Sequence, residues 1–223
     1  MKYLALTLVM ASASCRPRTA IVVFAASSVG ELAEEAGAAW TKRTGTPVRV
    51  QTGSSALLSR QIREGAPCDV FLSADAEWVE MFRVMDRRDW LENRLALVVR
   101  RDAPDREPES LALGGEGVPA GKYARIALER SGMQVPSRVV YGASVRDVLS
   151  KVVAGAADAA IVYVTDAALA PEVRIARVFS EDAHPPIVYV AVLFTSGGRG
   201  YFEALRDPAT LESAERRGFR RRP

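Results

Sequence analysis

The segment Ile21-Val22-Val23-Phe24-Ala25-Ala26-Ser27-Ser28 decides the fold class of this 223-residue chain. Its first five residues form a continuous apolar, β-branched run, which is typical of a strand buried on both faces. Ser28-Val29-Gly30-Glu31 then fits a capping box, in which Ser28 accepts from first-turn amides and Glu31 reaches back. A buried strand that leads directly into a helix is the first half of a βαβ unit.

The same alternation of strands and helices continues outward from this segment. The patterns predict further strands at 48–52, 69–72, 95–99, 139–141, 159–164, 173–179 and 187–194, and a reduced strand at 111–113. They predict helices from Ser28 to Gly45, at 56–64, 75–84, 118–130 and 144–155, and in the segment that carries Phe202, Leu205, Leu211 and Phe219. We therefore expect an α/β fold with mostly parallel sheets.

The composition is that of an ordinary globular protein, with 48% hydrophobic and 26% charged residues. The formal net charge is only +3, and the arginines are interleaved with acidic residues. The sequence therefore predicts no nucleic-acid partner. The basic tail, 216–223, is expected to be solvated and frayed.

The first residues have the pattern of an export signal. Lys2 precedes an apolar run and then the small residues that end at Cys15. This pattern predicts a periplasmic or otherwise extracytoplasmic location. Two processing routes stay open, which are plain signal cleavage and attachment of a lipid at Cys15. The other cysteine, Cys68, is expected to be unpaired, and with His184 as the sole histidine no protein metal site is predicted.

Four turns of small residues stand directly before predicted helices: Ser27-Ser28, Ser54-Ser55, Pro119-Ala120 and Ser144-Val145. A helix N-terminus presents unpaired backbone N–H groups and the positive end of the helix dipole. In an open α/β sheet such turns lie at the carboxyl ends of strands, where ligands bind. Each turn alone fits a plain helix cap, but together they indicate an anion site that needs no cationic side chain.

Several segments resemble one family of binding proteins, the periplasmic molybdate-binding proteins. The resemblance rests on Val23-Phe24-Ala25-Ala26-Ser27-Ser28, on 52–62 and 65–75, and further along on 118–124 and 161–167. These segments keep the family's order and spacing over most of the chain. Ser27, where the family commonly has Ala, and the short stretch 101–117 depart from its pattern.

The resemblance implies a two-lobed periplasmic-binding-protein fold with crossing hinge strands. Residues 1–19 would be the signal segment and a short linker, 20–95 plus 189–223 the N-terminal lobe, and 96–188 the second lobe. Ser28 and Ser55 match the family's binding serines, Ala120 and Val145 match positions that donate backbone N–H, and Tyr163 matches a tyrosine whose hydroxyl reaches the anion. The implied protein is a monomer without cofactor that captures molybdate or tungstate for an ABC permease, with no metal other than that of the oxyanion.

Other functions stay open at this point. Sulfate or phosphate are alternative tetrahedral ligands, although the matched turns carry no carboxylate to accept a phosphate proton. A serine hydrolase would need a general base near Ser28 or Ser55, and His184 lies in a proline turn. The effector domain of a transcription regulator shares the architecture, but the export signal counts against it. We expect a binding protein and no enzyme.

Overall fold

The computed structural model describes residues 20–222, which form two β-sheets with helices packed on them. The first unit is strand β1, Ile21–Ala26, followed by a 3-10 turn, Ser27–Val29, and helix α1, Gly30–Thr44. Gly45 ends α1 in the left-handed conformation, at φ 74°, which costs glycine no side-chain clash. The predicted βα unit is therefore confirmed.

The first sheet has the strand order β11-β4-β10-β3-β1-β2. Its other strands are β2 (Val48–Gly53), β3 (Val70–Ser73), β4 (Asp86–Asn93), β10 (Ile187–Leu193) and β11 (Arg220–Arg221). The helices that accompany it are α1, α2 (Ser55–Arg63), α6 (Arg199–Ala204) and α7 (Pro208–Arg216).

The second sheet has the order β7-β6-β8-β5-β9. Its strands are β5 (Leu95–Arg100), β6 (Ser110–Gly114), β7 (Arg138–Gly142), β8 (Ala159–Tyr163) and β9 (Val173–Val178). The helices of this part are α3 (Pro119–Ser131), α4 (Val145–Val153) and α5 (Val164–Ala168).

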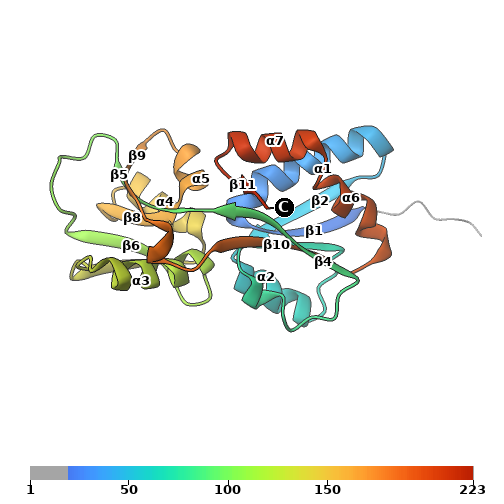
Figure 1. The fold of residues 1–223 in the computed structure, drawn as a ribbon, viewed down its shortest axis with the longest axis horizontal. Helices are drawn as coiled ribbons and strands as arrows, with labels where there is room; N and C mark the ends of the chain where they lie inside the picture. Colours follow the sequence, from blue (N-terminus) through green and yellow to red (C-terminus); the bar gives the residue numbers. More distant parts are fainter. Residues whose placement is uncertain (1–19, 223) are drawn as a thin grey trace, which may run out of the picture.

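Each sheet gives one lobe of an elongated molecule, and β4 and β10 run between the lobes (Figure 1). β4 leads through Arg94 into β5, and the chain returns from β9 to β10. The strands of the first sheet come from residues 21–93 and 187–221, and those of the second from 95–178. The lobe boundaries at residues 95 and 189 stay a prediction.

The sheets are mixed. β1 pairs in parallel with β2 and β3, and β6 with β7 and β8. The ladders of β10 with β3 and β4, and of β5 with β8 and β9, are antiparallel. The expectation of mostly parallel sheets thus holds for the strands that precede helices and fails for the strands that connect the lobes. The chain passes to the second lobe through β4 and β5 and returns in the opposite direction through β9 and β10.

Alternate residues of β1 enter two separate parts of the core. Val23 and Ala25 pack with Leu32 of α1 in the larger cluster, whereas Phe24 packs with Leu58 of α2 on the other face of the sheet. All of these side chains are at most 3% exposed. The continuous apolar run is explained by this burial on both faces.

The prediction of a helix at 75–84 is wrong. Only a 3-10 turn, Ala76–Trp78, forms there, and it is followed by the unpredicted strand β4. Five of the eight residues of β4 are charged, and its fully buried positions are Trp90, Leu91 and Asn93. A crossing strand with such a polar sequence lacks the apolar alternation that marks a strand.

Residues 216–222 of the basic tail are ordered, although a frayed end was expected. Phe219 is 4% exposed and its ring lies 5.2 Å from that of Tyr189, and Arg220–Arg221 pair with β4. Phe219 also lies outside a helix, contrary to the prediction, because α7 ends at Arg216. The strand at 111–113 is not reduced, since β6 has five residues, all buried, and lies between β7 and β8.

Some predictions fall outside the described residues or at their margin. The export signal and Cys15 lie in 1–19, outside the part of the chain that the structure describes. Between residues 20 and 222, no helix is both long enough and apolar enough to span a bilayer. Cys68 is a free thiol, half-buried beside β3, and desolvation raises its pKa to about 12.

Candidate anion-binding site between the lobes

All five residues that the sequence singled out line one cavity between the two lobes. These residues are at most 4% exposed, and the cavity is small, with a volume of ≈ 10 Å³. Its complete lining is Ala26, Ser27, Ser28, Gly53, Ser54, Ser55, Ala74, Val118, Pro119, Ala120, Val145 and Tyr163. The structure brings the five residues together, and their contact with a ligand stays a prediction.

Four of these residues lie at or just before helix N-termini. Ser55 and Val145 are the first residues of α2 and α4, Ala120 is the second residue of α3, and Ser28 lies in the turn before α1. The first amides of a helix have no partner within it, and the dipole makes this end positive. Four such ends at one cavity provide a site for negative charge that is built from the backbone.

Close packing of two glycines brings the start of α3 to the cavity. A Cβ atom at Gly121 would lie 2.1 Å from the carbonyl oxygen of Gly114, which ends β6. No side chain fits at that distance, so the backbone of α3 rests directly on the end of β6. The position of the Ala120 amide is therefore fixed by backbone contact.

Ser28 is not a helix cap, contrary to the predicted capping box. Because the 3-10 turn places the start of α1 at Gly30, Ser28 lies one residue before the N-cap, Val29, which makes no side-chain cap. The Ser28 Oγ instead lies 2.6 Å from the Tyr189 hydroxyl, and Glu31 pairs with Arg146 at 2.8 Å. This leaves Ser28 free to face the cavity.

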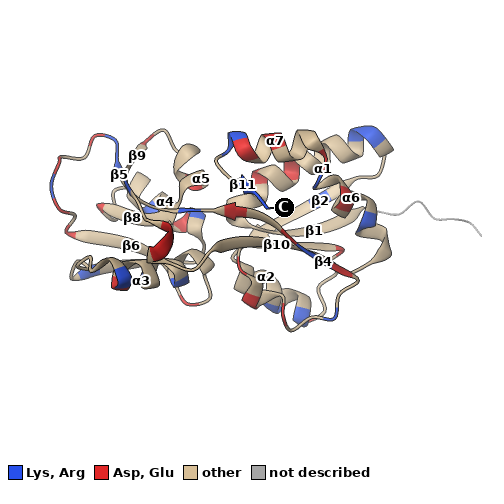
Figure 2. Ribbon diagram, in the orientation of Figure 1, with Lys and Arg blue, Asp and Glu red and all other residues tan. Residues whose placement is uncertain are grey.

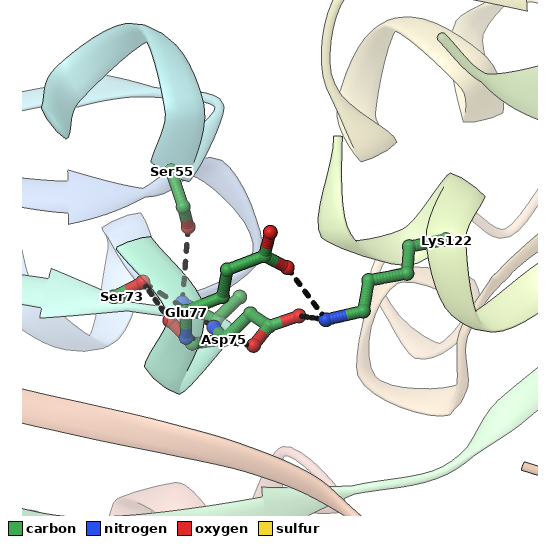
Figure 3. Close-up of polar contacts among 6 residues, drawn as sticks. Ser55, Ser73, Asp75, Glu77 and Lys122 are labelled. Atoms are coloured by element: carbon green, nitrogen blue, oxygen red, sulfur yellow. Dashed lines mark hydrogen bonds and ion pairs between the residues drawn. The ribbon is translucent and has the colours of Figure 1, made fainter. Parts of the chain in front are cut away.

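Ser55 is held by the neighbouring strand end. Its Oγ accepts a hydrogen bond from the backbone N–H of Ala74 at 3.0 Å (Figure 3). The adjacent Ser54 takes the capping role and accepts from the N–H of Leu57 at 3.3 Å. The Ser55 hydroxyl thus has its oxygen engaged and its hydrogen left to donate into the cavity.

Tyr163 carries a buried hydroxyl that has no hydrogen-bond partner among the described residues. Leaving such a group unpaired costs about 1–3 kcal/mol. Burial raises the pKa of Tyr163 well above its usual value, so the hydroxyl stays protonated at neutral pH. An acceptor in the cavity would satisfy it.

No charged side chain lines this cavity among residues 20–222, but ion pairs flank it on both sides. The Lys122 Nζ of α3 lies 2.8 Å from Asp75 Oδ2 and 2.7 Å from Glu77 Oε2 (Figure 3). These two ion pairs join the second lobe to the first. Lys and Arg as well as Asp and Glu occur on both lobes (Figure 2). The Asp75 carboxylate also caps the 3-10 turn at Ala76–Trp78 by accepting from the backbone N–H of Glu77.

The second flanking pair includes a buried carboxylate. Arg146 of α4 contacts Glu31 of α1 across the lobes, and its Nε lies 2.6 Å from Asp166 Oδ1, at an angle outside hydrogen-bond geometry. Asp166 is fully buried, and desolvation raises its pKa to about 6 although Arg146 opposes the shift. Arg146 is thereby turned away from the cavity that its neighbour Val145 lines.

The sequence did not reveal the groups behind the cavity. Tyr189, which contacts Ser28, comes from the crossing strand β10, and Asn93, which contacts Tyr189, comes from the crossing strand β4. Tyr189 stands in an otherwise apolar run, and a single buried tyrosine in a strand gives no signal of a site. Asn93 could not be found because β4 itself was not predicted.

His184 lies away from the cavity. Its Nδ1 contacts the carbonyl oxygen of Pro185 at 2.8 Å, and its ring packs against Tyr123. A larger cavity, ≈ 290 Å³, lies elsewhere in the second lobe, between the loop 102–108 and Gly155, Ala157 and Asp158. It contains none of the five residues, and its mixed charges do not form a defined donor set.

Comparison with known proteins agrees with this architecture. The sequence model for the family described as "Bacterial extracellular solute-binding protein" matches residues 21–220. The chain is 30% identical to the molybdate-binding protein ModA of Escherichia coli K12 over 226 residues, which covers 89% of this chain and 88% of that protein.

Two solved structures show the same two-lobed fold. The substrate-binding domain of a molybdenum ABC transporter protein from Clostridium difficile has a TM-score of 0.71 at 25% identity, covering 91% of this chain and 99% of that one. The periplasmic molybdate-binding protein of Azotobacter vinelandii has a TM-score of 0.78 at 21% identity, covering 89% and 98%. With matches over nearly its whole described length, this chain belongs to the bacterial extracellular solute-binding protein family.

Proposed function

We propose that this protein captures molybdate, or the similar tungstate, outside the cytoplasm and delivers it to the permease of an ABC importer. The observation that carries the proposal is the cavity itself. Four helix starts, two serine hydroxyls and the unpartnered Tyr163 hydroxyl meet there, and no charged side chain among the described residues lines it. A fully deprotonated tetrahedral oxyanion matches such a set, because it offers only acceptors.

The neutral lining supports binding by oriented dipoles. A lysine or arginine would attract many anions, whereas amides and hydroxyls fixed by the backbone fit one arrangement of oxygens. Donors that are already in place need no reorganisation when the ligand arrives. The names of the relatives, which include molybdate-binding proteins, support the choice of anion.

Catalysis is not part of the proposed function. A hydrolase would need a general base beside Ser28 or Ser55, and the cavity lining contains no histidine, carboxylate or lysine within the described residues. His184 is held in its turn by Pro185.

We propose that the protein acts as a monomer, which light scattering with and without molybdate would test. We also propose that it is exported, with lipid at Cys15 as one means of retention.

Calorimetric titration tests the proposed ligand. Molybdate, tungstate, sulfate and phosphate are titrated separately into the same preparation, and we expect one site per chain that binds the first two tightly and the others weakly or not at all. Preferential binding of sulfate would move the assignment to another oxyanion. Absence of heat and of thermal stabilisation with all four anions would refute an oxyanion site.

A further inference from the structure

A chain of buried hydrogen bonds connects Ser28 to the two strands that cross between the lobes. The Ser28 Oγ lies 2.6 Å from the hydroxyl of Tyr189 in β10, and Asn93 Nδ2, at the end of β4, donates to that hydroxyl at 3.3 Å. Ser28, Tyr189 and Asn93 are at most 5% exposed. Water therefore does not compete for these groups.

The direction of each hydrogen bond between Ser28, Tyr189 and Asn93 can be derived by starting from Asn93. A backbone N–H can only donate, and that of Arg94 donates to Asn93 Oδ1 at 2.9 Å. The two hydrogens of the Asn93 amide then point to Thr165 Oγ1, at 2.9 Å, and to the Tyr189 hydroxyl. All the bonding groups of the Asn93 side chain are used in this arrangement.

The Tyr189 hydroxyl must consequently donate its hydrogen bond to Ser28 Oγ. The Tyr189 oxygen accepts from Asn93. Within the described residues, Ser28 Oγ is the acceptor to which the single hydroxyl hydrogen of Tyr189 can bond. If Ser28 donated instead, the hydrogen of Tyr189 would lie buried without an acceptor, which is unfavourable. The hydrogen of Ser28 is therefore left for the cavity that Ser28 lines.

The tyrosine is held rigidly for this task. Its ring makes edge-on contacts with Tyr163, at 6.0 Å between centroids, and with Phe219, at 5.2 Å. In the ladder of β10 and β4, Tyr189 pairs with Leu91 and Val190 with Asp89, so that Trp90 is the extra residue of a β-bulge. Bulges of this kind redirect side chains beside binding sites.

We propose that Tyr189 and Asn93 are positioning residues that keep the Ser28 hydroxyl oriented as a donor toward the bound anion. This inference rests on the proposed function, since it assigns these residues a role in the same site. Neither residue lines the cavity, so both act through Ser28. These hydrogen bonds from Asn93 through Tyr189 to Ser28, which we call the relay, also link ligand binding to the crossing strands, because Tyr189 lies on β10 and Asn93 on β4.

A double-mutant cycle with molybdate tests the relay. Tyr189→Phe removes only the hydroxyl, and we expect it to weaken molybdate binding about tenfold when Ser28 is present, within the range for losing a hydrogen bond to a charged group. In the Ser28→Ala background the same substitution is expected to change the dissociation constant less than twofold. Equal effects in the two backgrounds would show a general structural role and overturn the proposal.

Asn93→Asp provides a second test, because it should reverse the direction of the hydrogen bond between Tyr189 and Ser28. An aspartate would accept the hydrogen of Tyr189, so Ser28 would have to donate to Tyr189 and would turn away from the anion. The added negative charge repels the anion in both backgrounds, so the reversal is measured as the extra loss, about tenfold, that appears only when Ser28 is present. Identical losses with and without the Ser28 hydroxyl would contradict the derived direction.

Tyr201→Phe is the matched control. Tyr201 is equally buried in the same lobe, and its hydroxyl donates to the carbonyl oxygen of Ala33 at 3.0 Å, away from the cavity. It should lower the unfolding temperature and leave the molybdate affinity within twofold of the unaltered chain. Failure of the unaltered chain to bind molybdate or tungstate would refute the proposed function itself, whereas an additive cycle with intact binding would refute only the relay.

Discussion

At the scale of single residues, the two cavity serines have their oxygens engaged by different partners. Tyr189 donates to Ser28, and the backbone N–H of Ala74 donates to Ser55. Each partner is rigid and buried, so the remaining hydroxyl hydrogen has few other places to point. Uncharged side chains thereby become directed donors, and their strength comes from orientation in a site of low dielectric.

Ser55→Ala tests this view for the second serine. We expect it to weaken molybdate binding by about 1–3 kcal/mol, because it removes a buried donor to a charged ligand and leaves the N–H of Ala74 without its acceptor. Calorimetry measures the change.

The control for Ser55→Ala comes from the same helix. Ser59 is 2% exposed, and its hydroxyl donates to the carbonyl oxygen of Trp78, outside the cavity. Ser59→Ala should lower stability and leave affinity nearly unchanged. If both variants lose affinity equally, the loss belongs to α2 as a whole and the role of the Ser55 hydroxyl is wrong.

At the scale of elements, the contacts between helices of opposite lobes hold the cavity closed. Lys122 on α3 reaches the turn at Asp75 and Glu77, and Arg146 on α4 reaches Glu31 on α1. Each of these cations comes directly or nearly directly after a cavity residue, Ala120 or Val145. The same helix starts that face the anion therefore also join the lobes.

Lys122→Ala is expected to weaken molybdate binding about two- to fivefold. The Lys122 side chain is 42% exposed, so its pairs contribute at most about 1 kcal/mol to closure and are screened by salt. The affinity is measured by calorimetry in 0.05 and 0.5 M sodium chloride, and the difference from the unaltered chain should shrink at high salt.

Lys151→Ala matches this variant in charge. Lys151 pairs with Asp147 four residues earlier on α4, within one lobe, at 3.1 Å. It should have little effect on affinity at either salt concentration. Equal losses for the two lysines would mean that net charge, and not contact between lobes, is responsible.

The sequence predicted those elements whose burial follows a regular pattern. The apolar runs of β1, β3, β8 and β10 predicted their strands, and the turns before α1, α2, α3 and α4 indicated the segments that carry Ser28, Ser55, Ala120 and Val145. Tyr163 was assigned only from the resemblance to a known family. β4 could not be predicted, because a strand with five charged residues is stabilised by its partners β10 and β11 and not by its own composition. Contacts between distant segments, such as Ser28 with Tyr189, have no local signal at all.

At the scale of the whole molecule, the stability is expected to depend on pH through Asp166. The unfolded carboxyl has a pKa near the model-peptide value of 3.8, whereas burial raises the pKa in the folded protein to about 6. Between these values the folded state binds more protons than the unfolded state. Stability from this group is therefore lost as pH rises from about 4 to about 6.

Comparison with Asp166→Asn isolates this contribution, because the other titrating groups cancel. The free energy of unfolding in urea is measured for both proteins from pH 4 to 7.5. The unaltered chain should lose up to about 3 kcal/mol relative to the variant as pH rises to 6, at about 1.4 kcal/mol for each pKa unit, and no more above that. A constant difference over this range would show that Asp166 is ionised throughout.

The place of β10 between β3 and β4 has a consequence for how the molecule is made. A ribosome delivers β3 and β4 long before residues 187–193, so the first sheet lacks its middle strand until late in synthesis. The strands of the second sheet all lie within 95–178 and can pair as they emerge. The lobe that begins the chain is thus the one completed last.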